Sequence, residues 1–246
     1  MIIKSLNTLF NKFGYKLLKD NEKEEYAEFY DLYLECKPYT MTSIERMYSL
    51  YKGVEYVIKN KIEGDFVECG VWKGGSSMLI AKTLLKFGVS DRKIWMYDTY
   101  EGMVEPGDED KDPAGGMAHE IWTKLKQDDK SGWCVSSLEE VKNNLSATNY
   151  PNELLHFIPG MVEDTIPKQM PEKEIALLRL DTDWYESTKH EMQFMFPLLV
   201  HSGVLIIDDY GHWEGAKKAI DEYVQQHNIA LFLHKVDYTA RIAIKV

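Results

Sequence analysis

Residues 177–188 read LLRLDTDWYEST, a strand-like apolar run followed by acidic and aromatic residues. An apolar run ends in two carboxylates, Asp181 and Asp183, and a second apolar run, VLIIDD (204–209), ends in two aspartates as well. Runs that are apolar throughout are typical of strands that helices cover on both faces. The segment between the two runs holds one helix, which is the length of a crossover. Two neighbouring parallel strands would therefore bring these carboxylates to one edge of a sheet.

The same alternation of short apolar runs and helical segments continues along the chain. We expect strands at 65–70, 94–98, 155–160, 175–181, 204–209, 230–236 and 241–246. We expect helices at 43–60, 76–87, 137–147, 187–201 and 214–228. This order predicts an α/β fold with a doubly wound, mostly parallel, Rossmann-like seven-stranded sheet, whose last two strands form an antiparallel edge hairpin.

The chain divides into an N-terminal helical extension or lid, 1–60, and a second domain, 61–246. Within the second domain, the segment 99–134 is different, and its residues 101–120 are acidic and rich in glycine and proline. So long an irregular stretch is typical of a functional lid or a disordered loop. Because it follows the second strand, it would lie over the carboxyl edge of the sheet, where ligands bind in open α/β folds.

Composition excludes several classes of protein. The 246 residues are 44% hydrophobic and carry a net charge of −11, without the basic stripe of a nucleic-acid-binding protein. Cys36, Cys69 and Cys134 are far apart in sequence, which argues against a zinc site or a disulfide framework and favours the reducing cytoplasm. No apolar run is long enough to predict a transmembrane helix.

Residues 1–20 have apolar side chains at helical spacing with lysines between them. A basic amphipathic helix of this kind lies either on a membrane surface or against protein. Packing on its own domain or on a dimer mate is the favoured interpretation, and peripheral membrane contact is the alternative.

The stretch GDFVECGVWKGGSS (64–77) predicts a strand, a glycine turn and the start of a helix. Glycines such as Gly70 let the backbone turn tightly and approach a ligand, and the helix start offers free N–H groups. Asp98, at the end of the next strand, is well placed to accept hydrogen bonds from both hydroxyls of a ribose. The bulky Trp72 stands where a dinucleotide fingerprint needs a second glycine, which argues against a pyrophosphate. S-adenosylmethionine fits better; the alternative is a structural turn without a cofactor.

The strand-end aspartates predict a metal site. Asp181, Asp208 and Asp209 would repel one another unless a cation lay among them, and oxygen ligands favour Mg²⁺. A metal lowers the pKa of a hydroxyl that it binds, so that Asp183 could take the proton as a general base. The alternative is that these aspartates are solvated residues at strand ends.

In these motifs the chain resembles the macrocin O-methyltransferase family. Its members are S-adenosylmethionine- and Mg²⁺-dependent enzymes that methylate sugar hydroxyls of macrolide and aminocoumarin antibiotics, with relatives in bacterial glycan clusters. The matching motifs, in chain order, are YTM (39–41), GDFVECGVWKGGSS (64–77), YDTYEGM (97–103), GMVEDTIP (160–167), LLRLDTDWYEST (177–188) and VLIIDDYGHWEGAKKAIDEY (204–223).

The resemblance implies a class I methyltransferase fold, a sugar-bearing acceptor on a small molecule or glycan, and a homo-oligomer. It places Asp181, Asp208 and Asp209 on the metal and makes Asp183 the base. The residues that it places around the cofactor are Glu68, Gly70, Ser76 and Asp98, and Ser137 is added from its position in the chain. The family often has glycine where Thr182 stands.

Other functions share some of these motifs. A glycosyltransferase uses a DxD motif to hold a metal and a nucleotide diphosphate, and a phosphatase uses an aspartate nucleophile in a similar motif. Trp72, the missing phosphate cradle and the late position of DTDWY argue against both. A non-catalytic binding protein on the same fold is the third alternative.

Overall fold

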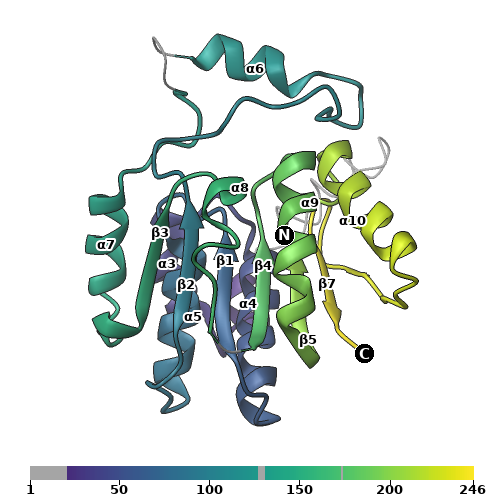
Figure 1. The fold of residues 1–246 in the computed structure, drawn as a ribbon. Helices are drawn as coiled ribbons and strands as arrows, with labels where there is room; N and C mark the ends of the chain where they lie inside the picture. The colour runs from purple at the N-terminus through teal and green to yellow at the C-terminus, as the bar shows by residue number, and fades with distance from the viewer. Residues whose placement is uncertain (1–20, 127–130, 173) are drawn as a thin grey trace, which may run out of the picture. The chain divides into compact units, whose positions relative to one another are not determined.

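The computed structural model describes residues 21–126, 131–172 and 174–246 (Figure 1). The amphipathic stretch 1–20 lies outside the described residues. The chain forms two compact units, Met1–Asp31 and Leu32–Val246. Of the first unit, the described part holds helix α2 (Glu22–Glu25) and an edge-to-face contact between the Tyr26 and Phe29 rings, whose centroids are 5.9 Å apart.

A single seven-stranded sheet organises the second unit, in the order β3-β2-β1-β4-β5-β7-β6. Strands β3 to β5 in this order pair in parallel, whereas β7 pairs antiparallel with β5 and β6. This confirms the predicted α/β class, the mostly parallel sheet and the edge hairpin. The strands are β1 (Asp65–Cys69), β2 (Ile94–Asp98), β3 (Leu155–Pro159), β4 (Ile175–Leu180), β5 (Leu199–Ile207), β6 (His234–Lys235) and β7 (Arg241–Ile244).

Helices cover both faces of the sheet (Figure 1). Helix α4 packs on β4, β5 and α5, and α9 and α10 pack together on the other face. Serine side chains cap α4 and α7 by accepting a hydrogen bond from the backbone N–H three residues on. Helix α3 (Tyr30–Cys36) begins with the last two residues of the first unit and continues into the second. The other helices of the second unit, within the described ranges, are α4 (Ile44–Lys59), α5 (Gly75–Lys86), α6 (Ala118–Leu125), α7 (Leu138–Ser146), α8 (Val162–Thr165), α9 (Tyr185–Phe194) and α10 (Glu214–Gln226).

Two predicted boundaries are wrong. The helix expected over 187–201 ends at Phe194, because a 3-10 turn over Phe196–Leu198 with a proline inside it follows, and β5 begins directly afterwards at Leu199. The strand expected over 230–236 pairs only at His234–Lys235. Helix α4 belongs to the same compact unit as the sheet, and the division of the chain at residues 60 and 61 stays a prediction.

The acidic segment after β2 is more ordered than its composition suggests. It contains α6, which Figure 1 shows above one edge of the sheet. The buried Asp110 accepts hydrogen bonds from the backbone N–H groups of Gly107 and Tyr185, both at 2.8 Å, and so ties the segment to the start of α9. The indole of Trp184 likewise donates to the Val104 carbonyl at 3.1 Å. None of the helices within the described ranges is long and apolar enough to cross a bilayer.

Gly70 allows the ends of β1 and β4 to meet. Its φ is +85°, and a Cβ atom there would lie 2.0 Å from the backbone oxygen of Asp181. The backbone N–H of Asp181 donates to the Cys69 carbonyl at 2.8 Å. Glycine is therefore required here by a strand-to-strand contact, in addition to the tight turn that the sequence predicts.

This contact predicts that Gly70→Ala destabilises the fold more than an alanine at another left-handed glycine. Gly88 is the matched control, because its φ is +73° and no atom lies within 4 Å of a Cβ built there. We expect Gly88→Ala to lower the free energy of unfolding by about 1–2 kcal/mol, the cost of the left-handed backbone alone. Gly70→Ala should lose more, because Asp181 must also move. Urea unfolding measures both values, and equal losses would contradict this role of Gly70.

Candidate active site

A cavity of about 440 Å³ opens at the carboxyl ends of the central strands. It lies where the strand order reverses between β1 and β4, the usual ligand position in open α/β sheets. This volume suits a small-molecule ligand. The glycine turn, the strand ends and the acidic segment all contribute to its wall, including Trp72, Ser76, Asp98, Trp133, Asp183 and Asp208.

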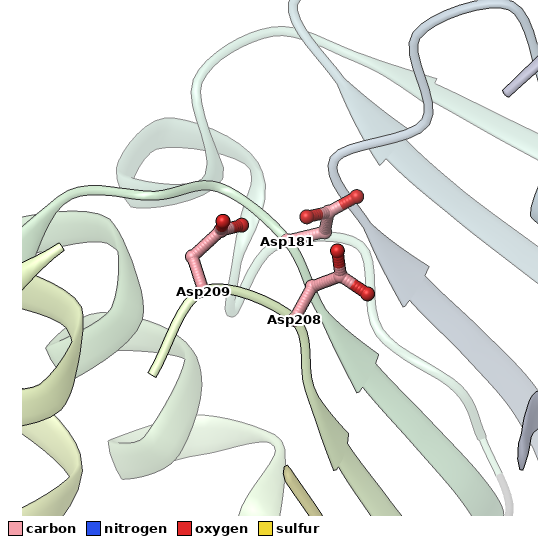
Figure 2. Close-up of side chains that lie close together, drawn as sticks. All are labelled: Asp181, Asp208 and Asp209. Carbon is pink, nitrogen blue, oxygen red and sulfur yellow. The ribbon is translucent and has the colours of Figure 1, made fainter. Parts of the chain in front are cut away.

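Three of the four strand-end aspartates form a carboxylate cluster, defined here as Asp181, Asp208 and Asp209. One oxygen atom of each lies within 4.8 Å of the others, and Figure 2 shows them at the ends of β4 and β5. The parallel pairing of these two strands brings the residues together, as the sequence predicts. Metal binding by the cluster stays a prediction.

A buried guanidinium holds the cluster in place. Arg179 Nη1 lies 2.7 Å from Glu68 Oε1 and 2.8 Å from Asp181 Oδ2, and Nη2 lies 2.8 Å from Asp208 Oδ1. The Arg179 side chain is only 3% exposed. Arg179 is absent from the residues predicted for the site, although the sequence carries a signal for it: Arg179 is the one charge in the apolar run IALLRL, and a buried charge requires partners.

A second arginine approaches the cluster from α4. Arg46 Nη1 lies 2.5 Å from Asp208 Oδ2, and Arg46 Nε lies 3.1 Å from Asp237 Oδ2. Asp208 thus has a guanidinium on each oxygen. A carboxylate offers about four lone-pair positions, so these ion pairs leave room for a metal on the same group. Nothing in the sequence around Arg46 indicated this contact.

Crowding of the carboxylates creates an electrostatic demand for a cation. Burial raises the pKa of Asp181 and of Asp209 well above the usual range, and the negative charges of neighbouring carboxylates add to the effect. A hard divalent ion would offset this repulsion, and all three side chains offer oxygen, the donor that Mg²⁺ prefers. The residues present therefore fit such an ion.

Asp183 lies in the cavity wall beside the cluster, at a backbone φ of +70°. Burial, together with the charges of Asp181 and Asp208, raises its pKa to about 7, against the opposing effects of a hydrogen bond with Asp209 and of the charge of Arg179. A carboxyl group with this pKa exchanges its proton near neutral pH, which suits a general base.

The predicted cofactor residues fall into two groups. Glu68, Gly70, Ser76 and Asp98 line the cavity. Ser137 does not, because it caps α7 by accepting from the Glu140 N–H at 3.1 Å and is exposed.

Asp98 organises the glycine turn. One of its oxygens accepts from the backbone N–H groups of Val71 and Trp72, at 2.7 and 3.0 Å, and the other accepts from the Tyr100 N–H at 2.7 Å. Glu68 is likewise held, by Arg179 and by the Ser77 hydroxyl. Direct contact of Asp98 with a ribose stays a prediction.

An aromatic wall, consisting of Trp133, Trp184 and Trp213, forms another side of the cavity. The three indoles meet edge to face, with ring centroids 5.1 to 6.2 Å apart. His212 extends this wall, because its ring lies 4.5 Å from Trp213 and its Nδ1 lies 3.1 Å from the Tyr238 hydroxyl. The contribution of Trp133 could not be predicted, since it comes from the segment expected to be irregular.

Comparison with known proteins identifies relatives over most of the chain. Residues 9–243 match the model of the family described as Macrocin-O-methyltransferase (TylF). The chain is 34% identical to a demethyldecarbamoylnovobiocin O-methyltransferase from Streptomyces niveus, over 81% of this chain and 72% of that protein. It is 31% identical to an 8-demethyl-8-(2,3-dimethoxy-alpha-L-rhamnosyl)-tetracenomycin-C 4'-O-methyltransferase from Streptomyces olivaceus, over 82% and 73%.

Solved structures of methyltransferases share the fold. The O-methyltransferase NovP superposes with a TM-score of 0.74 at 31% identity, covering 85% of this chain and 82% of that one. The calicheamicin methyltransferase CalS11 gives 0.62 at 16% identity, covering 93% and 94%, which shows the fold alone. The class I methyltransferase fold is therefore established for this chain.

The guanidinium network predicts that Arg179→Met is strongly destabilising and that its effect depends on pH. Removing the charge leaves buried carboxylates uncompensated, which costs about 3–5 kcal/mol near neutral pH. The pKa values of Glu68 and Asp181, already raised by burial, would rise further without Arg179. Because protonated carboxyls lose this penalty, the deficit should be smaller at pH 5 than at pH 7.5.

Urea unfolding of the wild type and of Arg179→Met, at pH 5 and at pH 7.5, measures how the loss of stability depends on pH. Lys218→Met is the control, since Lys218 forms an exposed ion pair with Glu109 at 2.9 Å and its loss should change little. A deficit of Arg179→Met that is equal at both pH values would contradict the electrostatic role.

Proposed function

Since this chain belongs to the macrocin O-methyltransferase family, we propose that it transfers a methyl group from S-adenosylmethionine to a sugar hydroxyl. The acceptor is a glycosylated natural product or a bacterial glycan, Mg²⁺ is required, and Asp183 is the general base. One observation supports this most: the carboxylate cluster, Asp183 and the glycine turn all line the same cavity.

The glycine turn and the start of α5 provide the cofactor side of the cavity. Val71 and Trp72 in the turn, and Gly75 and Ser76 at the helix start, face the same space. Free N–H groups at the helix start favour electron-rich ligand atoms. Trp72 leaves no room for a pyrophosphate-binding backbone at its position, which favours S-adenosylmethionine over a dinucleotide.

Asp181, Asp208 and Asp209 would hold the metal. When bound, Mg²⁺ would polarise the acceptor hydroxyl and lower its pKa. Arg179 and Arg46 fix two of these carboxylates from behind, so that the oxygens are oriented before any ligand binds.

Asp183 would then take the hydroxyl proton on its carboxylate. The acceptor oxygen forms a bond to the methyl carbon, the carbon–sulfur bond breaks, and the donor leaves as an uncharged thioether. Asp183 gains the proton that the acceptor loses. Its pKa of about 7 places it close to the working pH, where a base is most effective.

The acceptor side of the cavity favours an uncharged sugar. Among the described residues that line it, the cations are Arg46 and Arg179, and both are paired with carboxylates. A nucleotide diphosphate would therefore find no unpaired cation in this part of the wall, which argues against the glycosyltransferase alternative. Trp133 is the part-exposed indole of the aromatic wall and can stack on the apolar face of a sugar ring, whereas Trp184 and Trp213 are only 2% and 5% exposed and support it from behind. The two named relatives are O-methyltransferases of a rhamnosyl-tetracenomycin and of demethyldecarbamoylnovobiocin, which supports the same acceptor class.

The proposal places the enzyme in the cytoplasm as a homo-oligomer. Cys36, Cys69 and Cys134 are free thiols in the structure, which is compatible with a reducing compartment. Size-exclusion chromatography coupled to light scattering would determine the number of subunits.

Calorimetry with S-adenosylhomocysteine, with and without Mg²⁺, tests the proposed function directly. We expect S-adenosylhomocysteine to bind in the cavity. Mg²⁺ titrated into that complex should then give a binding isotherm with a stoichiometry of one ion per chain. Chelation of the metal with EDTA should then abolish methyl transfer to sugar acceptors. Mass spectrometry measures this transfer as a gain in acceptor mass of one methylene. A flat trace for S-adenosylhomocysteine would favour the binding-protein alternative.

Asp183→Asn tests the base. We expect turnover to fall by about 10²–10⁴-fold, the contribution of a general base, because the amide accepts no proton at neutral pH. The affinity for S-adenosylhomocysteine should stay within twofold, since the side chain keeps its size. Asp91→Asn, at an exposed position outside the cavity, is the control. Normal turnover by Asp183→Asn would remove Asp183 from the mechanism.

A further inference from the structure

Glu191 is a fully buried carboxyl group to which the proposed mechanism gives no role. It lies on α9 and is 0% exposed. Its Oε1 accepts a hydrogen bond from the Thr182 hydroxyl at 2.9 Å. Its Oε2 is buried and has no oxygen or nitrogen partner within the described part of the chain, and its polar neighbour is the thiol of Cys69, a weak hydrogen-bonding group. A buried polar group of this kind is costly and needs an explanation.

The surroundings of Glu191 favour its uncharged form. Burial raises its pKa well above the usual range, and the negative charges of Glu163 and Asp181 act in the same direction, against the hydrogen bond from Thr182. An uncharged carboxyl group can still accept from Thr182 through its carbonyl oxygen. Glu191 therefore adds no negative charge to a region that is already crowded with carboxylates.

Thr182 is the residue between Asp181 and Asp183, in a sharply bent turn. The Trp184 N–H donates to the Thr182 carbonyl at 2.8 Å, and Asp183 has a φ of +70°. A non-glycine residue in this conformation costs energy and persists only where its surroundings hold it. On the Asp181 side, the backbone bond to Cys69 provides such a constraint. In the middle of the turn, the Thr182 hydroxyl adds a tether to Glu191, beside a longer contact of 3.5 Å from the Ser187 hydroxyl to the Thr182 carbonyl. Glycine at this position would lose the tether to Glu191.

We propose that Glu191 is a positioning residue for the turn 181–183. Through the Thr182 hydroxyl it keeps Asp181 in the carboxylate cluster and keeps Asp183 in the cavity. Neither Glu191 nor Thr182 contacts the reacting atoms in this scheme; both act through the aspartates on either side of Thr182. The inference rests on the proposed function, because it assumes that the cluster binds a divalent cation.

Two pairs of variants test the tether. Thr182→Val removes the hydroxyl at nearly constant size, and Thr182→Ser retains it. Glu191→Met removes the acceptor, and Glu191→Gln retains a carbonyl oxygen at the same position. The readouts are the Kd of Mn²⁺ in the complex with S-adenosylhomocysteine, the Kd of S-adenosylhomocysteine itself, and the thermal midpoint.

We expect Thr182→Val and Glu191→Met to weaken Mn²⁺ binding by about 10–100-fold, the usual effect of losing a group that orients a metal ligand. Thr182→Ser and Glu191→Gln should stay within threefold of the wild type, and all four variants should bind S-adenosylhomocysteine within about threefold. If Glu191→Met does not fold, Thr182→Val still tests the tether, since it leaves the core unchanged.

The outcomes separate this inference from the proposed function. Unchanged Mn²⁺ affinity in Thr182→Val, with only a lower thermal midpoint, would show that the Thr182–Glu191 pair is merely structural and would overturn the inference alone. A wild-type protein that binds S-adenosylhomocysteine but no Mn²⁺ or Mg²⁺ would overturn the metal-dependent mechanism, and this inference with it.

Discussion

The contact of one buried guanidinium with three carboxylates is the interaction on which the site depends. Arg179 reaches Glu68 on β1, Asp181 after β4 and Asp208 after β5. Without a positive charge at this point, three neighbouring strands would end in like charges that lie close together. In a buried region with a low dielectric constant, the repulsion between these charges is weakly screened. Because the guanidinium is planar and offers several donors in fixed directions, it also sets the angle at which each carboxylate enters the cavity. Neutralisation and orientation thus come from the same side chain.

The parallel pairing of β1, β4 and β5 makes this contact possible, and glycine makes the pairing possible. Parallel strands end at the same edge, so residues far apart in sequence arrive side by side. At Gly70 the chain leaves β1 in a left-handed conformation and passes within contact of the Asp181 backbone. A side chain at Gly70 would separate the turn that carries the cofactor side from the strand end that carries the carboxylates. The two halves of the cavity are therefore joined by backbone contact as well as by charge.

The sequence predicts the sheet and the edge at which the site lies, because both follow from local patterns: apolar runs, glycine turns and strand-end acids. It does not predict Arg179 and Arg46 as partners of Asp208, since pairing depends on the register of strands and on how α4 packs, and neither leaves a trace in a single sequence. Ser137 is a different case, because its contact with the cofactor stays a prediction. Its capping motif is correctly predicted, but the cap uses the side chain locally and leaves it outside the cavity. The end of α9 was misplaced because apolar residues continue past Phe194 into β5, and only the intervening 3-10 turn separates the two elements.

Chemically identical groups acquire different roles in this cavity through their surroundings alone. Glu68 is held by Arg179 and Ser77, and is therefore an anchor for the arginine. Burial and the negative charges of neighbouring carboxylates raise the pKa values of Asp181 and Asp209. A divalent cation among these groups would offset the repulsion between them. Asp183, with a pKa of about 7, lies between the charged and uncharged forms, as a proton acceptor should. Glu191 on α9 is 0% exposed, and burial raises its pKa well above the usual range, so its surroundings favour the uncharged form, which contacts Thr182 without adding to the repulsion. These acids would repel one another if all were ionised. Arg179 offsets the charge of Glu68, burial favours the protonated form of Glu191, and in the proposed function a divalent cation offsets the charges of the carboxylate cluster.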